Sequence, residues 1–191
     1  GSLYKIFLKR KLAIQKWKFG KNNDYEDLQL VDSVFYVLAS SGDITRIKFY
    51  SADSLQAEIF KFPAEGKNEF ESMFYDETTN SLNMICKDCE GDKKKSITTW
   101  AFNIMDGSYK ISSLAIDISA IAKDLGLEKI KLKPSATAIN PVTNELFILS
   151  SVNKSLIIVD QSGQVKEAYP LNPSLYKQPE GIAFTPNGDL L

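Results

Sequence analysis

Three glutamates and a serine recur at one position of an internal repeat and could together bind a cation. They are Glu26, Glu71, Ser135 and Glu180, and each begins a similar phrase of the sequence. In a ring of repeats such positions converge on one rim. Carboxylates are hard oxygen ligands, which suit calcium better than zinc. We therefore predict a metal site of Glu26, Glu71 and Glu180 at a channel mouth, with calcium as its ion.

Neighbouring polar side chains would assist at this rim. Asp27 and Ser72 follow two of the glutamates, and Ser135 takes the glutamate position in the third copy. A second interpretation is also open: each carboxylate could cap backbone amides or pair with a basic residue, as polar groups near water commonly do. Acids paired with lysines would favour this second interpretation.

The chain of 191 residues contains no histidine. This absence excludes the Ser-His-Asp and Cys-His forms of nucleophilic catalysis. It also removes the commonest nitrogen ligand of zinc, copper and iron. Any acid–base chemistry would have to use carboxylates, lysine or tyrosine.

Two cysteines, Cys86 and Cys89, enclose Lys-Asp at the end of a predicted strand. A redox-active pair of this spacing needs a helix N-terminus to lower the thiol pKa, and here a strand runs into a loop. A zinc site needs two more ligands, and the chain has no other cysteine and no histidine. We predict a local disulfide in an oxidising compartment, with free thiols as the next alternative and redox or metal chemistry as the last.

Short strands separated by turn residues must position these side chains. Glu26 and Glu71 are 45 residues apart, as are Ser135 and Glu180, and each interval of this length holds about four strands. Such a period is typical of propeller blades, whose sheets bury their faces against one another. The sequence predicts an all-β β-propeller, a partial copy of a larger ring, as a single domain over residues 1–191. The expected blades are 1–19 (partial), 25–62, 69–116, 134–171 and 180–191 (partial).

One helix and many aromatic side chains complete the prediction. In residues 117–126 Ile118, Ile121 and Leu125 share one helical face, Asp117 or Ser119 can cap the start, and Gly126 suits a left-handed stop. We expect this helix over the mouth that carries the glutamates. The aromatic residues at strand spacing are assigned to packing between blades, with a carbohydrate platform as the alternative.

The composition places further limits on partners. Hydrophobic residues make up 43% of the chain and the net charge is −1, so nothing favours nucleic acid. No window approaches the roughly 18 apolar residues of a membrane span.

The repeats resemble those of the SdiA-regulated family of bacterial six-bladed propellers, which are similar to NHL-type and esterase-like propellers. The segments that carry the resemblance are Tyr25-Glu-Asp-Leu, Phe70 to Leu82, Asn140 to Ser150 and Pro179 to Leu190. The resemblance implies six blades, of which about four are present here. It also implies a periplasmic or envelope location, often as a lipoprotein, and it supplies no catalytic mechanism.

Two functions follow as expectations. The first is a non-enzymatic propeller of the bacterial envelope that binds an unknown small molecule or protein at one channel mouth. The alternative is a calcium-assisted hydrolase of the lactonase or esterase kind, in which rim carboxylates hold calcium and position water.

Overall fold

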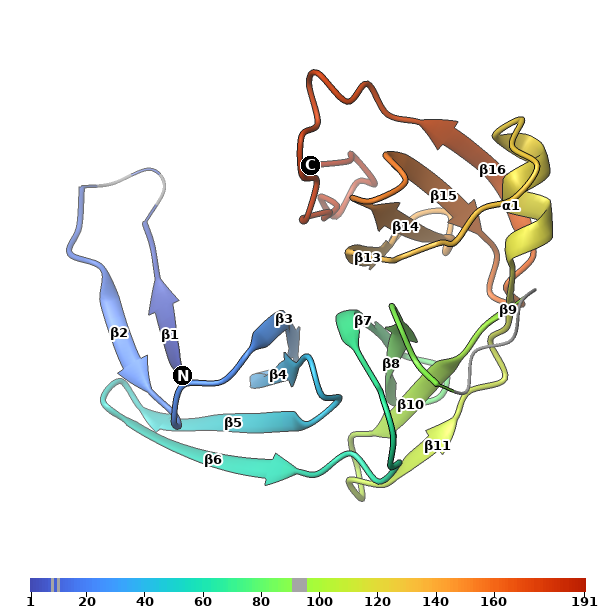
Figure 1. Ribbon diagram of the computed structural model, residues 1–191. Helices are drawn as coiled ribbons and strands as arrows, with labels where there is room; N and C mark the ends of the chain where they lie inside the picture. Colours follow the sequence, from blue (N-terminus) through green and yellow to red (C-terminus); the bar gives the residue numbers. More distant parts are fainter. Residues whose placement is uncertain (8, 10, 91–95) are drawn as a thin grey trace.

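The computed structural model describes residues 1–7, 9, 11–90 and 96–191 and shows an open arc of antiparallel sheets (Figure 1). Three of the sheets have four strands each, and two have two strands. Each four-stranded sheet runs from an inner strand to an outer strand in the manner of a propeller blade. The predicted all-β propeller fold is therefore confirmed.

The three blades follow the chain in order. The first consists of β3 (Tyr25–Val31), β4 (Val34–Ala39), β5 (Ile44–Ser51) and β6 (Ser54–Phe60). The second consists of β7 (Phe70–Asp76), β8 (Ser81–Cys86), β10 (Thr99–Asn103) and β11 (Tyr109–Ile111). The third consists of β13 (Ala136–Ile139), β14 (Leu146–Ser150), β15 (Ser155–Val159) and β16 (Val165–Pro170).

Two short pairings lie outside the blades. A hairpin at the N-terminal end pairs β1 (Ser2–Lys5) with β2 (Gln15–Lys18). The sequence predicted a single blade over residues 69–116. Instead, β9 (Ser96–Ile97) and β12 (Ile116–Asp117) separate from the blade and pair with each other.

Burial increases toward the middle of the arc. Every residue of β8 is buried, whereas β6 alternates exposed and half-buried positions. The difference arises because a central blade is covered on both faces, so its strands become continuous apolar runs. The inner strands β3, β7 and β13 are neighbours in that order, with β7 between the other two.

Aromatic rings fill the space between the first two blades. Phe102 of the second blade packs edge-on against Phe60 of the first, with ring centroids 5.1 Å apart. Phe62, in the connection between the blades, meets Trp100 at 4.8 Å. These contacts agree with the assignment of the aromatic residues to packing between blades.

The equivalent turns of two repeats have the same backbone conformation. Asn80 and Asn144 both have positive φ, +49° and +59°, in the hairpins that follow the inner strands. Asparagine tolerates this left-handed region better than most residues do. Four residues earlier in each hairpin, Asp76 and Asn140 accept hydrogen bonds from backbone amides of the turn. The similarity of these two repeats in sequence thus extends to the backbone conformation of their turns.

The predicted helix is present as α1 (Ile118–Asp124). Asp117 caps it by accepting a hydrogen bond from the amide of Ser119, and Gly126 follows it at φ +67°. Its position differs from the expectation. The helix lies at the outer edge against β16 and β9, not over the inner rim, because its buried face covers the outer strand of the third blade (Figure 1).

The fourth repeat also differs from the expectation. No strand begins at Glu180, and the last residues form a single bridge between Phe184 and Leu190. This segment contacts the third blade through the carbonyl of Pro179, which accepts from the hydroxyl of Ser135 at 2.9 Å, and through the ring of Phe184, whose centroid lies 4.9 Å from that of Phe147.

Candidate binding site at the inner rim

Two of the predicted glutamates occupy the same special backbone position. The pairing of β3 with β4 skips Glu26, and the pairing of β7 with β8 skips Glu71. Each is the extra residue of a β-bulge. Bulges interrupt the alternation of a strand and re-aim a side chain, and they are common beside functional sites. The repeat therefore delivers both carboxylates to the same end of neighbouring inner strands.

A lysine occupies the space between the acids. Lys87, directly after β8, bonds the Glu71 carboxylate and lies 2.8 Å from that of Glu69. All three side chains are largely shielded, with exposed fractions of 18%, 23% and 32%. Burial lowers the pKa of Lys87, but its hydrogen bonds to Glu69 and Glu71 outweigh this and raise it above its ordinary value.

Glu26 completes this group, which we call the mouth cluster: Asp24, Glu26, Glu69, Glu71 and Lys87. Burial raises the pKa of the Glu26 carboxyl, and the negative charges of Asp24, Glu71 and Glu69 raise it further. Lys87 partly offsets these charges. The cluster therefore contains four carboxylates and one ammonium group, which is bonded to two of them.

Glu180 does not join the mouth cluster. It is exposed, it lies in a segment without a strand, and it is not among the charges that act on Glu26. Within the described ranges no group of three or more acidic or cysteine side chains has the spacing of a metal site.

Two of the three predicted assisting residues, Asp27 and Ser135, hold neighbouring segments together. Asp27 accepts a hydrogen bond of 2.7 Å from the amide of Met73 in the next blade. Ser135 contacts the carbonyls of Leu149 at 3.3 Å and Pro179 at 2.9 Å. Ser72 is fully buried, and its hydroxyl has no hydrogen-bond partner among the residues described.

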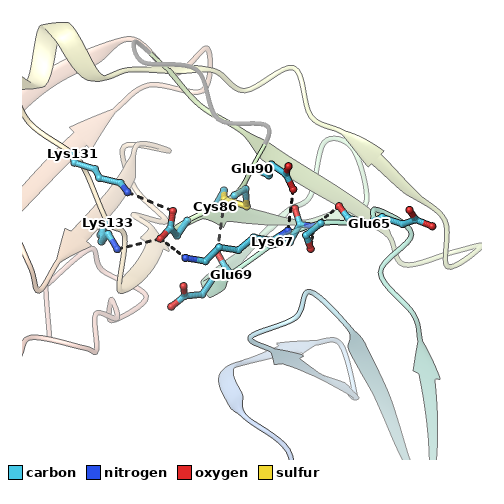
Figure 2. Close-up of a disulfide and its surroundings, with 11 residues drawn as sticks. Glu65, Lys67, Glu69, Cys86, Glu90, Lys131 and Lys133 are labelled. Atoms are coloured by element: carbon cyan, nitrogen blue, oxygen red, sulfur yellow. Dashed lines mark hydrogen bonds and ion pairs between the residues drawn. A yellow bond between two sulfur atoms is a disulfide. The ribbon is translucent and has the colours of Figure 1, made fainter.

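A disulfide closes the loop that carries Lys87. The sulfurs of Cys86 and Cys89 are bonded, with their Cα atoms 5.9 Å apart. The loop is also fixed to the preceding segment, because the amide of Lys87 donates to Glu69 and that of Glu90 to Lys67. Figure 2 shows this arrangement, with Glu69 and Lys67 beside the disulfide.

The second residue of the loop forms an opposite charge arrangement. The carboxylate of Asp88 lies 2.8 Å from the ammonium of Lys67 and 3.5 Å from those of Lys131 and Lys133 (Figure 2). We call Asp88 with these three lysines the basic flank. A hydrogen bond from Lys67 and the charges of the lysines lower the pKa of Asp88 to about 2. Lys87 and Asp88 are adjacent in the chain, but Lys87 belongs to the negatively charged mouth cluster and Asp88 to the positively charged basic flank.

Sequence reasoning did not assign roles to Lys87, Asp88 or Glu69. The available signal was the pair of unlike charges between the two cysteines. The disulfide encloses one positively and one negatively charged residue, Lys87 and Asp88, and so holds both charges in a fixed loop. Each of these charges then needs a partner of opposite sign.

The fold is shared with solved β-propellers of several functions. No known protein family matches the sequence, and no curated protein does. A catalytically inactive virginiamycin B lyase from Staphylococcus aureus superposes with a TM-score of 0.60 at 13% identity, over 99% of this chain and 55% of the lyase.

Two further structures match in the same way. A Bacteroides caccae protein of unknown function gives a TM-score of 0.56 at 13% identity, over 92% of this chain and 55% of that one. A putative 6-phosphogluconolactonase from Bacteroides uniformis gives 0.54 at 10% identity, over 84% and 46%. This chain therefore spans about half the length of these structures, and the likeness shows the fold alone.

Among the described residues, no helix is both long and apolar enough to cross a membrane.

Proposed function

We propose that this chain is part of a non-enzymatic binding propeller of the bacterial envelope, which recognises a ligand or partner at its inner rim. The observation that carries the proposal is the position of Lys87. Its ammonium group is bonded to Glu69 and Glu71, where a calcium ion would need free carboxylate oxygens. Acids paired with a lysine fit a recognition surface better than a catalytic metal site.

The arrangement of charge indicates what kind of partner this surface would bind. The mouth cluster has an excess of negative charge, whereas the basic flank has three lysines for one carboxylate. The side chains of Lys67 and Lys131 are 64% and 72% exposed, so their ammonium groups are open to a partner. A peptide or protein segment with separated positive and negative charges would be complementary to both.

The disulfide supports a location in the envelope. Disulfides form and persist in oxidising compartments such as the periplasm, and they are rare in the reducing cytosol. Alkylating the free thiols of intact cells before lysis tests this point. We expect Cys86 and Cys89 to escape alkylation; modification of both would contradict the location.

A second candidate function is the calcium-assisted hydrolase. The observation that favours it is the raised pKa of Glu26, because a divalent cation would relieve the crowding of Asp24, Glu69 and Glu71 around it. In that case calcium would have to displace Lys87 from the carboxylates of the mouth cluster.

Thermal unfolding in chelator and then in millimolar calcium separates the two functions. A ligand that binds only the folded state raises the melting temperature by mass action. The binding function predicts no shift with calcium. The hydrolase predicts a rise that is lost in a Glu26→Gln, Glu71→Gln double variant. A calcium-dependent rise with hydrolysis of a simple lactone would overturn the non-enzymatic proposal.

A further inference from the structure

A cavity lies between the second and third blades, away from the mouth cluster. Its volume is about 240 Å³, slightly below the range of roughly 300–1,000 Å³ of drug-sized sites. Phe74, Leu114, Ile139 and Leu146 supply apolar lining. Asp76, at the end of β7, also lines it, whereas Glu71 lies near the start of that strand. The cavity and the mouth cluster are thus at opposite ends of one inner strand.

A buried side-chain amide with an unpaired NH2 group lines this cavity. Asn83 of β8 is only 5% exposed and lines the cavity. Its Oδ1 accepts a hydrogen bond of 3.1 Å from the hydroxyl of Ser112, but its Nδ2 has no partner among the described residues. Because Nδ2 keeps some solvent access and Asn83 lines the cavity, an acceptor can reach this donor from the cavity. A buried donor of this kind needs an acceptor.

A second free donor lines the same cavity. Lys110 of β11 is exposed, and its ammonium group has no ion pair or hydrogen bond within the described part of the chain. Its positive charge acts on Asp106, as the last of several causes that lower the pKa of that carboxyl. Lys110 and Asn83 therefore offer one charged and one neutral donor.

The two acids that line the cavity are already satisfied. Asp76 accepts hydrogen bonds from Thr78 and Thr79. Asp160 accepts bonds from Ser162 and Gln164, and its second oxygen lies 3.5 Å from the ammonium of Lys166. These bonds lower the pKa of both carboxyls, so each stays ionised at neutral pH with its oxygens occupied. The two carboxylates therefore leave the donors of Asn83 and Lys110 unused.

We infer that this cavity between the blades binds a small organic carboxylate with an apolar body. The carboxylate would accept hydrogen bonds from Nδ2 of Asn83 and Nζ of Lys110, and the carbon skeleton would contact Phe74 and Leu114. The cavity volume limits the ligand to roughly the size of a single aromatic ring with a short acid chain. The site is independent of the function proposed for the inner rim.

Nuclear magnetic resonance with phenylacetate as the probe tests this inference. The side-chain amide resonances of Asn83 report on the proposed contact directly. We expect them to shift in a saturable way with phenylacetate, to respond at least tenfold more weakly to neutral phenylacetamide, and not to respond to 2-phenylethylamine. Equal binding of the amine, or no saturable shift with phenylacetate, would overturn the inference.

Variants separate the cavity from the general surface. Lys110→Gln changes an exposed side chain, so it should fold normally and bind phenylacetate roughly tenfold more weakly through loss of a charge-assisted bond. Lys129→Gln removes an equal charge outside the cavity and should bind like the wild type. Asn83→Leu should abolish binding. If Lys110→Gln and Lys129→Gln bind alike, the site is not the one inferred here.

Discussion

At the scale of single residues, two acids of the inner rim, Glu71 and Asp27, are stabilised by different kinds of partner. Glu71 shares an ammonium group with Glu69, whereas Asp27 relies on backbone amides of its own strand and the next blade. The Glu71 carboxylate is therefore stabilised by a positive charge, whereas the Asp27 carboxylate is stabilised by neutral hydrogen-bond donors. The two should respond differently to substitution and to pH.

Replacing Lys87 by methionine should destabilise the protein and raise the pKa of Glu26 further. The variant leaves Glu69 and Glu71 shielded without a cation, which costs about 1–3 kcal/mol of unfolding free energy. Because the folded-state pKa of Lys87 is raised, its stabilisation is complete below its unfolded value of 10.5 and is lost as pH rises through the folded value.

Urea unfolding at neutral pH measures this effect, with Lys61→Met as the matched control. Lys61 pairs with Asp43 at 2.6 Å, but its side chain is 78% exposed. A surface pair of this kind contributes only about 0–1 kcal/mol. Equal losses in the two variants would show that Lys87 has no special role.

Asp27→Asn should flatten the dependence of stability on pH. Burial raises the pKa of Asp27 above its ordinary 3.8, although amide hydrogen bonds from Met73 and Leu28 oppose the shift. The folded state therefore holds its proton more tightly than the unfolded state. The stabilisation that this difference in pKa provides is complete at pH values below the ordinary pKa of 3.8, and it is lost as the pH rises through the pKa of the folded state.

The check is the unfolding free energy at a series of pH values from acid to neutral. In the wild type the unfolding free energy should fall as the pH rises through the folded-state pKa of Asp27, and in Asp27→Asn this fall should be absent. Asp124→Asn, which changes an exposed acid of α1, should retain it. A fall of the same size in all three proteins would mean that another group titrates.

At the scale of elements, the disulfide loop links the two charge clusters of the rim. Lys87 and Asp88 are consecutive, yet Lys87 is bonded to acids of the β7 segment. Asp88 is paired instead with lysines that precede and follow it in the chain (Figure 2). The bond between Cys86 and Cys89 limits how far these two residues can move. The loop therefore matters more for the placement of charge than for the stability of the blade.

Replacing both cysteines by alanine should lower stability only slightly. In the chain-entropy treatment a loop this short contributes about 2 kcal/mol at most. The blade should stay folded while the ion pairs of Lys87 and Asp88 loosen. Thiol titration of the unfolded, unreduced wild type is the accompanying measurement, and two free thiols would refute the bridge.

At the scale of the whole molecule, stability depends on how each blade is joined to the next. Tyr109 of β11 inserts its hydroxyl into the first blade. The hydroxyl accepts from the amide of Ile44 at 3.1 Å and lies 2.9 Å from the carbonyl of Phe60. Burial, followed by the charge of Asp43, raises the pKa of this phenol, although the bond from Ile44 opposes the shift.

Tyr109→Phe should weaken the contact between the first two blades. The ring would remain packed, but the amide of Ile44 would lose its partner at a cost of about 1–3 kcal/mol. Tyr75→Phe is the control, because the hydroxyl of Tyr75 donates to the exposed side chain of Asn80 and not to another blade. Chemical denaturation compares the two. A loss in Tyr75→Phe as large as that in Tyr109→Phe would contradict the role of Tyr109 as a link.

The sequence by itself determined the features that depend on local chemistry. Repeat spacing indicated the blades, and the left-handed Asn80 and Asn144 follow from turn preferences that act within a few residues. The helix follows from its apolar period and from the cap at Asp117. The cysteine spacing allowed a local disulfide because only two residues separate the sulfurs.

Only the tertiary structure decided which side chains meet. Glu71 could have joined Glu180, but a fourth inner strand does not form, and Lys87 reaches Glu71 from the end of β8 instead. The bulges that aim Glu26 and Glu71 arise from strand pairing, which a linear repeat does not encode. The placement of α1 depended on which outer strand left an apolar face to cover. Such pairings depend on how twisted sheets stack, and that stacking is a property of the assembled arc.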